Sequence, residues 1–473
     1  MWHNVPIDMH ERGNFMNRKE RYSHRYLGNG FKVSNDTWQT HLNNKDLIVG
    51  SSGSSKTGSI VYPQLKSLQD SSLIVVDTKG RLEKLFRDEL TEKGYKVKVL
   101  DFVNPENSCK YNPLSYIRIN KDGSYREQDI AKVAAALIPD SSSVEAFWPR
   151  SARRYLEFFI AFVLMKLPET QHNMSEVAKF YAFYVGGGDN SEYVNRFIRF
   201  HQNSLVAKRH AQICGEKTAD RTRASILTFV SMALAPFEYA EYEEFFKYRY
   251  ERRYECKINF GNDKDDDEWE YVDEDLWDKI DEEDDGILTL CDEVVDIASL
   301  GREKTVLFLN ISDCDHSMDH IVNLFYTQAL QTLISEADAN PDGQLKVPVR
   351  IIMDDFASSA VIPDFDKIIS VVRSRDIWLT MCIQSFAQLE SLYSHTQAQT
   401  IINNCDHIVY LGSNDLESAK FIGTRVNKTP ETILCMDRES EYLLESGKLG
   451  RLIKKIPSYG FSPEEESEIE IGA

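Results

Sequence analysis

Short runs of apolar, mostly β-branched residues occur in the first quarter of the chain and again in its last third, separated by longer helical stretches. Seven such runs predict strands: DLIVG, SLIVVDTKG, YKVKVLDF, KTVLFLNI, VPVRIIMDDF, IWLTMCIQS and HIVYLGS. Strands that are apolar on both sides and alternate with helices are typical of a parallel sheet covered on both faces. We therefore expect an α/β core with about seven, mostly parallel strands.

The middle of the chain has a different pattern. Apolar residues recur there at spacings of three and four over 130–138, 148–167, 174–185, 193–212 and 218–235. This spacing predicts helices, so we expect an all-α domain inserted into the α/β core. The pattern fits a purely structural bundle and a substrate-contacting domain equally well. The expected organisation is an irregular N-terminal arm (1–40), the core (41–118 and 296–457), the all-α domain (119–236), an acidic insertion (237–295) and an acidic tail (458–473).

Most of the negative charge lies in one segment. The formal net charge is −20, and residues 263–285 contain 15 acidic and two basic side chains. Blocks of like charge usually stay solvated. The interspersed tryptophans and tyrosine also fit an element that docks on a basic partner or mimics DNA.

The eight cysteines form no C-x-x-C pair, and no secretory signal precedes them. A structural zinc site is not expected, and the cysteines indicate a reduced, cytoplasmic chain. The longest apolar run, Phe158 to Met165, is bounded by Glu157 and Lys166. It is much shorter than the ~20 residues of a membrane-spanning helix. We expect neither a transmembrane segment nor a targeting peptide.

The stretch DLIVGSSGSSKTGS has the pattern of a phosphate-binding loop, in which a strand leads through a glycine-bearing turn into a helix. In the template G-x-x-x-x-G-K-[ST], backbone N–H groups surround the phosphates, the lysine reaches the β/γ oxygens and the hydroxyl binds Mg²⁺. The candidate residues for binding ATP and Mg²⁺ are Gly50, Gly53, Ser54, Ser55, Lys56 and Thr57. Ser55 stands where the template has its second glycine. The alternative is a surface turn rich in serine and glycine.

A second nucleotide signal is RIIMDDF, an apolar strand that ends in two carboxylates. Asp354 would hold Mg²⁺, and Asp355 would take the place of the glutamate that activates the attacking water. The alternative is that these two carboxylates are simply a solvated pair after a buried strand. Gln384 ends the next strand and could sense the γ-phosphate. Arg373 and Arg375 could reach a neighbouring subunit's nucleotide as arginine fingers, although an exposed pair at a helix end is common.

Together and in this order, these motifs resemble those of the TraG/TraD-type conjugative coupling proteins, which are related to the FtsK and HerA ATPases. The resemblance extends from about Asp46 to about Ser413. It rests on the phosphate-binding loop and on IVVDTKGRLEKLFRDELTEKGYKVKVLDF, YNPL, AFWPRSARRYLEFFIAFVL and VRIIMDDFASSAVIPDFDKIISVVRSRDIWLTMCIQSFAQL. The last of these is the longest and the most specific.

The resemblance implies a RecA-like P-loop NTPase core with an inserted all-α domain. It also implies a homo-hexameric ATPase that encloses DNA and drives it into a type IV secretion system. By this resemblance Lys56 and Thr57 bind phosphate and magnesium, Asp354 is the Walker B acid and Gln384 is the sensor. The implied partners are DNA, single- or double-stranded, the relaxase and the proteins of the secretion channel.

The chain departs from the family pattern at several positions. Ser55 replaces a glycine of the phosphate-binding loop, and Asp355 replaces a glutamate. Where the family has the motif D-P-K-G-E, this chain has DTKGR, so Thr78 and Arg81 replace the proline and the glutamate. We also expect none of the amino-terminal transmembrane helices that members of the family ordinarily carry. We therefore expect ATP binding with attenuated hydrolysis, and a cytoplasmic location with peripheral attachment to the inner face of the membrane through a partner. Two alternatives remain: a degenerate scaffold that recruits substrate without pumping, and a soluble DNA translocase of the FtsK/HerA kind.

Overall fold

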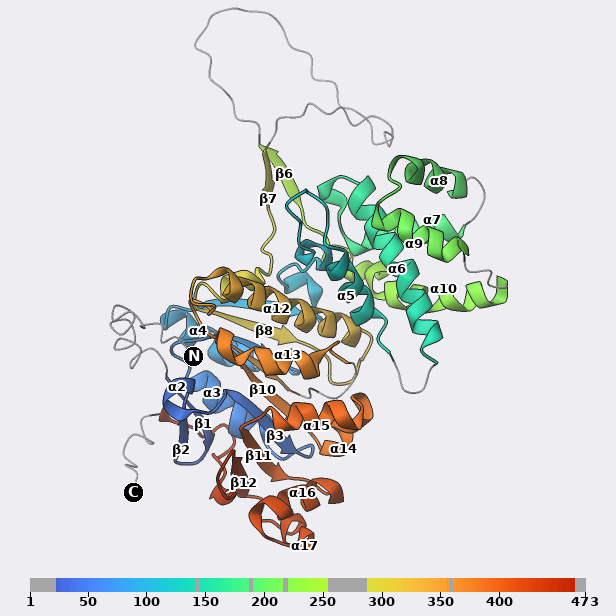
Figure 1. Ribbon diagram of the computed structural model, residues 1–473. Coiled ribbons are helices and arrows are strands. Elements are labelled where there is room, and N and C mark those ends of the chain that lie inside the picture. The colour runs from blue at the N-terminus through green and yellow to red at the C-terminus, as the bar shows by residue number, and fades with distance from the viewer. Residues whose placement is uncertain are drawn as a thin grey trace, which may run out of the picture.

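A nine-stranded sheet forms the centre of the computed structural model, which describes residues 23–140, 145–186, 190–215, 220–253, 287–354, 356 and 361–463. The strand order is β13-β12-β11-β3-β10-β9-β4-β8-β5 (Figure 1). The strands are β3 (Lys45–Gly50), β4 (Ser72–Val76), β5 (Lys96–Asp101), β8 (Thr305–Asn310), β9 (Val349–Met353), β10 (Ile377–Ile383), β11 (His407–Gly412), β12 (Ser440–Glu445) and β13 (Arg451–Lys454).

The seven strands from β11 to β5 are all parallel, and they are the seven runs that the sequence predicts. The α/β fold class with a mostly parallel sheet is therefore confirmed. β12 and β13 extend the sheet in antiparallel pairing beyond β11, and the sequence pattern does not predict them. One sheet thus contains strands from both ends of the chain.

Both faces of the sheet are buried, as near-continuous apolar strands require. Within β3, Leu47 and Val49 belong to one hydrophobic cluster, whereas Ile48, which points to the opposite face, belongs to another. Helices cover both faces. They are α3 (Tyr62–Lys66), α4 (Leu82–Glu92), α11 (Ile297–Leu300), α12 (Asp319–Ala339), α13 (Phe365–Val371), α14 (Phe386–Leu392), α15 (His395–Asn403), α16 (Leu416–Val426) and α17 (Pro430–Leu434).

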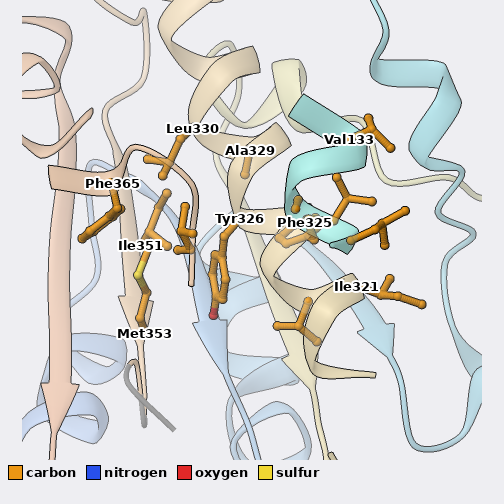
Figure 2. Packing of buried hydrophobic residues seen from close by; sticks show 14 of the residues in the cluster. Val133, Ile321, Phe325, Tyr326, Ala329, Leu330, Ile351, Met353 and Phe365 are labelled. Atoms are coloured by element: carbon orange, nitrogen blue, oxygen red, sulfur yellow. The ribbon is translucent and has the colours of Figure 1, made fainter. Parts of the chain in front are cut away.

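The long helix α12 packs over β9 and the strands beside it in the sheet (Figure 2). Phe325 and Leu330 of this helix are fully buried together with Ile351 and Met353 of β9. Phe365 of α13 completes this part of the core. The packing fixes the end of β9 against α12, which matters for the site described below.

The helices between the two sequence halves of the sheet gather at one side of it (Figure 1). They are α5 (Glu127–Leu137), α6 (Phe147–Lys166), α7 (Met174–Val185), α8 (Asn190–Phe200), α9 (Leu205–Gly215) and α10 (Asp220–Leu234). The single helix expected over 193–212 is wrong. The chain turns between α8 and α9, where the Ser204 N–H donates to the His201 carbonyl.

The expectation of an irregular arm over residues 1–40 is wrong for its last part. β1 (His24–Gly28) and β2 (Phe31–Ser34) form an antiparallel hairpin, followed by the short helix α2 (Thr37–Thr40). Arg25 is buried because it forms an ion pair with Asp46 of β3, so a charged residue anchors the hairpin to the sheet. Residues 1–22 lie outside the described residues.

The acidic insertion and the tail are described only in part. β6 (Tyr250–Arg253) and β7 (Ile287–Leu290) pair as a second hairpin, and the acidic residues 263–285 between them lie outside the described residues. The first residues of the tail lie against the core: Ser458 packs against Gly58 in the helix after β3, and Phe461 packs against Tyr26 of β1. Within the described ranges, no helix is both long enough and apolar enough to cross a membrane.

Candidate nucleotide site

The phosphate-binding loop follows β3 and leads into a π-helical turn, η2 (Thr57–Val61), which continues as α3. A Cβ at Gly50 would lie 2.3 Å from Oγ of Ser54 and 3.0 Å from Cβ of Leu411, so the glycine leaves room for the loop to fold back on the end of β3. Gly53 has a φ of +77° and Ser55 a φ of +72°. Ser55 therefore keeps the left-handed backbone that favours the glycine of the template.

Lys56 is buried at the start of this helix. Its Nζ donates to the carbonyl oxygen of Gly50 at 2.9 Å. A second carbonyl, that of Ser51, lies 3.5 Å from the same ammonium. The charge of Lys56 is thus held against the first residues of the loop, where the template places a phosphate-binding lysine.

Thr57 and Asp354 meet across the edge of the sheet. The hydroxyl of Thr57 donates to Oδ2 of Asp354 at 2.9 Å, although 297 positions separate the two residues in sequence. Asp354 directly follows β9, and β10 lies between β9 and β3. Both residues are partly exposed. A hydroxyl and a carboxylate suit Mg²⁺, which takes few protein oxygens and keeps several waters.

Gln384 lies at the same edge. It is the first residue after β10, which is the strand between the phosphate-binding loop and Asp354. Its backbone N–H donates to Oε1 of Gln388 at 2.9 Å, and its side chain is exposed. Asp355 lies outside the described residues.

The two arginines lie at the opposite edge of the sheet, before β10. Arg375 forms a bidentate ion pair with Asp338 at the end of α12, at 2.8 and 3.2 Å. Arg373 is exposed, and its Nη2 lies 3.4 Å from the carbonyl of His41. Within one chain neither arginine reaches the site, so any contact with a nucleotide has to be with that of another subunit.

Tyr326 is a residue of this region that sequence analysis missed. It belongs to α12, and its side chain extends toward the end of β9 beside Met353 (Figure 2). Its hydroxyl is buried and has no hydrogen-bond partner in the part of the chain that the structure describes. Burial and the nearby charge of Asp354 raise the pKa of Tyr326 well above its usual value. Helical periodicity predicts α12, but nothing local marks this tyrosine.

The carboxy-terminal segment also contacts the loop helix, which sequence analysis did not predict. The Tyr459 N–H donates to the carbonyl of Gly58 at 3.1 Å. The rings of Tyr62 and Tyr459 pack edge to face with centroids 5.5 Å apart. A Cβ on Gly58 would lie 2.0 Å from Oγ of Ser458. The helix that carries Lys56 and Thr57 is therefore held from outside as well as by the sheet.

Asp77 has a structural role. Its Oδ1 accepts the N–H of Arg81 and its Oδ2 that of Glu83, each at 3.1 Å. It caps the start of α4, so the carboxylate after β4 stabilises a helix end and is not directed into the candidate site.

Comparison with known families gives two matches. Residues 8–248 match the family model for conjugative DNA transfer of the type IV secretory system. Residues 348–435 match the model for the TraM recognition site of TraD and TraG. Among curated proteins, none matches the chain by sequence.

Solved structures share the fold at low sequence identity. The plasmid coupling protein TrwB in complex with the ATP analogue ADPNP is 12% identical, with a TM-score of 0.60, over 95% of this chain and 92% of that one. TrwB in complex with ADP and Mg²⁺ is 13% identical, with a TM-score of 0.58, over 92% and 95%. VirB4 of Thermoanaerobacter pseudethanolicus is 12% identical, with a TM-score of 0.50, over 94% and 98%. At this identity the similarity shows the fold.

Proposed function

Because the chain belongs to the family of type IV secretory system proteins for conjugative DNA transfer, in which it is a coupling protein, we propose that it binds ATP and Mg²⁺ at the sheet edge described above. It uses ATP to drive DNA toward the secretion channel. The observation that carries this proposal is the 2.9 Å hydrogen bond between Thr57 and Asp354. It joins the phosphate-binding loop to the first carboxylate of RIIMDDF.

Each residue has one role in this proposal. Lys56 binds the phosphate oxygens, and Thr57 and Asp354 hold Mg²⁺, which neutralises charge on the transferred phosphoryl group. Gln384, at the end of β10 between the strands that precede Thr57 and Asp354, senses the γ-phosphate. Asp355 orients the attacking water. The backbone of the loop from Gly50 through Gly53, Ser54 and Ser55 surrounds the phosphates.

The TrwB complexes support this choice of cofactors. That protein was solved with ADPNP and with ADP and Mg²⁺, and its fold is shared over nearly the whole of this chain. The oxygen donors at Thr57 and Asp354 fit Mg²⁺ independently of that comparison.

Assembly and organisation are part of the proposal. A homo-hexamer would bring Arg373 to a neighbouring subunit's nucleotide; Arg375 is the weaker candidate because Asp338 pairs with it. The core comprises 41–118 and 296–457, with the helical unit 119–236 beside it. Partners are DNA, the relaxase and the channel proteins, and attachment to the membrane occurs through such a partner.

The second candidate function is a nucleotide-binding scaffold that recruits substrate without pumping. Ser55 favours it, because a serine in a left-handed conformation makes the loop less adaptable than a glycine would. Asp355 favours it as well, because its carboxylate is one methylene shorter than that of glutamate.

Equilibrium binding of fluorescent ADP tests the site itself. Lys56→Ala should weaken binding at least about tenfold, because it removes a charge-assisted contact with phosphate. Lys121→Ala is the matched control, because Lys121 is exposed in a turn remote in sequence from the motifs. Equal affinity of wild type and Lys56→Ala would refute the proposed site.

A further inference from the structure

Tyr326 carries a hydroxyl that the packing of the core does not require. The residue lies on α12 and is 5% exposed. Val322 and Leu330, one turn before it and one turn after it, are buried on the same face of the helix. A phenylalanine would fill this place among apolar side chains equally well, so the hydroxyl is the part that calls for an explanation.

The other buried polar side chains of α12 have partners. The Thr327 hydroxyl donates to the carbonyl of Asn323 at 2.8 Å. The side-chain amide of Gln328 donates to the carbonyl of Pro113, also at 2.8 Å. The Tyr326 hydroxyl, in contrast, has no hydrogen-bond partner in the part of the chain that the structure describes.

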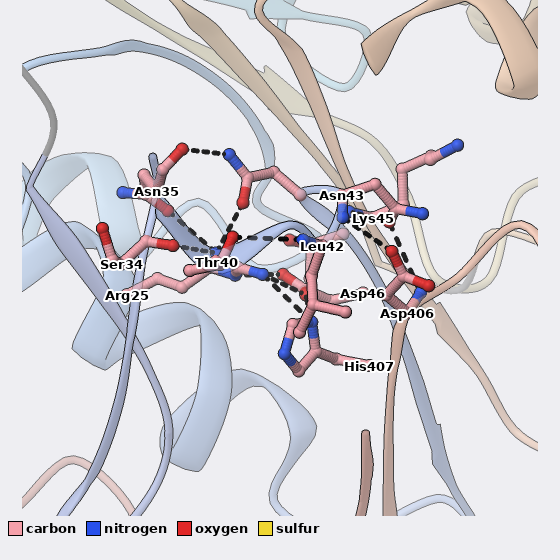
Figure 3. A network of polar contacts seen from close by, with 12 residues as sticks. Arg25, Ser34, Asn35, Thr40, Leu42, Asn43, Lys45, Asp46, Asp406 and His407 are labelled. Carbon is pink, nitrogen blue, oxygen red and sulfur yellow. Dashed lines mark hydrogen bonds and ion pairs between the residues drawn. The ribbon is translucent and has the colours of Figure 1, made fainter. Parts of the chain in front are cut away.

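The buried charge at the opposite edge of the sheet is also paired. Asp46, at the amino end of β3, is fully buried, and Arg25 donates to its two carboxylate oxygens at 2.9 and 3.0 Å (Figure 3). A buried polar group is costly unless it is hydrogen-bonded, so an unpaired one in a native core needs a reason. For Tyr326 the position of the hydroxyl supplies that reason.

The hydroxyl of Tyr326 is directed at the Mg²⁺ side of the nucleotide site. The side chain extends from α12 toward the end of β9, where Met353 directly precedes Asp354 (Figure 2). Burial and the charge of Asp354 raise the pKa of Tyr326 well above its usual value. The hydroxyl therefore keeps its proton and is available as a donor. Asp354 is the carboxylate to which Thr57 donates at 2.9 Å.

We propose that Tyr326 is a positioning residue of the Mg²⁺ site, whose hydroxyl donates a hydrogen bond to the Asp354 carboxylate, directly or through one water, when nucleotide and Mg²⁺ are bound. This inference rests on the proposed function, because that function assigns Mg²⁺ to Asp354. Groups that hydrogen-bond to a metal-binding carboxylate fix its orientation and typically contribute about ten- to a hundredfold to metal affinity or activity. Tyr326 acts through Asp354 and does not itself contact the substrate.

The Mg²⁺ dependence of ADP binding tests the proposal. Fluorescent ADP is titrated into the whole chain at a series of Mg²⁺ concentrations, which gives the Mg²⁺ concentration at which half of the gain in ADP affinity is reached. Tyr326→Phe should raise this concentration about tenfold, because Asp354 loses a group that orients it. The affinity for ADP without Mg²⁺ should stay unchanged, because Lys56 and the loop are intact.

Tyr95→Phe is the matched control. The hydroxyl of Tyr95 is also buried and has no hydrogen-bond partner within the described ranges. Tyr95 directly precedes β5 and therefore lies at the amino edge of the sheet, away from Asp354. Its substitution removes the same group from a similar environment and should leave the Mg²⁺ dependence unchanged. Urea denaturation verifies that both variants are folded.

A double-mutant cycle shows whether Tyr326 acts through Asp354. In the Asp354→Asn chain, adding Tyr326→Phe should change the half-maximal Mg²⁺ concentration by less than about twofold, whereas independent effects would add. An absent shift with Tyr326→Phe, equal shifts with both tyrosine variants, or additivity with Asp354→Asn would overturn the inference and leave the Mg²⁺ site in place. ADP binding by wild type that does not depend on Mg²⁺ would overturn the proposed Mg²⁺ site, and this inference with it.

Discussion

At the scale of single residues, the phosphate-binding loop keeps its shape despite an unfavourable residue. Ser55 has a φ of +72°, in the left-handed region where an L-residue with a side chain is strained. The loop therefore retains the conformation of the missing glycine at a cost in stability. We therefore expect the loop to keep its phosphate-binding shape and the strain to lower the stability of the fold.

Ser55→Gly should raise the free energy of unfolding by about 1 kcal/mol, because glycine adopts positive φ without strain. Urea denaturation measures the change. Ser52→Gly, in the same loop but without positive φ, should instead lower stability by roughly 0.5 to 1 kcal/mol through the unfolded chain. If the two substitutions have the same effect, Ser55 is not strained.

Tyr326→Phe should leave the protein as stable as wild type or up to about 1 kcal/mol more stable, because the ring still packs and a buried, unpartnered hydroxyl is removed. Thermal unfolding and urea titration check this. A loss of more than about 1 kcal/mol would mean that the hydroxyl makes a stabilising hydrogen bond.

Some residues of the site belong to short sequence patterns, whereas others reach it only through contacts between distant segments. Lys56, Thr57 and Asp354 follow strands in short patterns, so sequence alone predicts them, and the structure brings the latter two together. Tyr326 and Tyr459 reach the region through contacts between distant segments. No local pattern encodes such contacts, so sequence analysis missed both residues.

At the scale of elements, the seven parallel strands were predictable because burial on both faces makes their sequences continuously apolar. β1 and β12 were not, because each contains charged residues that the fold buries. Arg25 in β1 is 2% exposed and paired with Asp46, and Glu441 in β12 is 0% exposed. When elements are predicted from polar and apolar positions, charged residues are taken as exposed to solvent. The sequences of β1 and β12 therefore look like loops.

Glu441 predicts a dependence of stability on pH. Burial raises its pKa to about 8, against an opposing effect of Lys455, and neither carboxylate oxygen has a partner in the described part of the chain. The raised pKa means that the folded state retains a proton that the unfolded chain releases near 4.5. The stability from this group is therefore fully present below pH 4.5 and is lost as the pH rises toward 8.

Glu441→Gln should remove that part of the pH dependence, which amounts to a few kcal/mol at most. Denaturant titrations between the two pKa values measure it. Glu439→Gln is the matched control, because Glu439 is 84% exposed and should leave the pH profile unchanged. Identical profiles for wild type and Glu441→Gln would show that Glu441 is ionised without penalty.

At the scale of the whole molecule, the sheet separates two sets of residues. The phosphate-binding loop, Asp354 and Gln384 lie at the carboxyl ends of the parallel strands, whereas Arg373 lies at the amino end of β10. An arginine at the far edge can serve catalysis only between subunits. The proposed role of Arg373 as an arginine finger therefore requires assembly.

ATP hydrolysis per chain should rise with protein concentration as subunits assemble. Mixing Arg373→Ala with wild-type chains should inhibit out of proportion to its fraction, because each variant subunit disables a neighbour's site. Arg375→Ala should chiefly destabilise the chain, because Arg375 pairs with Asp338. Activity proportional to the wild-type fraction would indicate a self-contained site.

The most direct test of the account is Mg²⁺-dependent ATP hydrolysis by the whole chain, with and without DNA, for wild type and Asp354→Asn. We expect slow hydrolysis that requires Mg²⁺ and increases with DNA. Asp354→Asn should reduce the rate by about two orders of magnitude, because one preorganised electrostatic contact is lost. Nucleotide binding without hydrolysis under any of these conditions would contradict the motor and identify the chain as a scaffold.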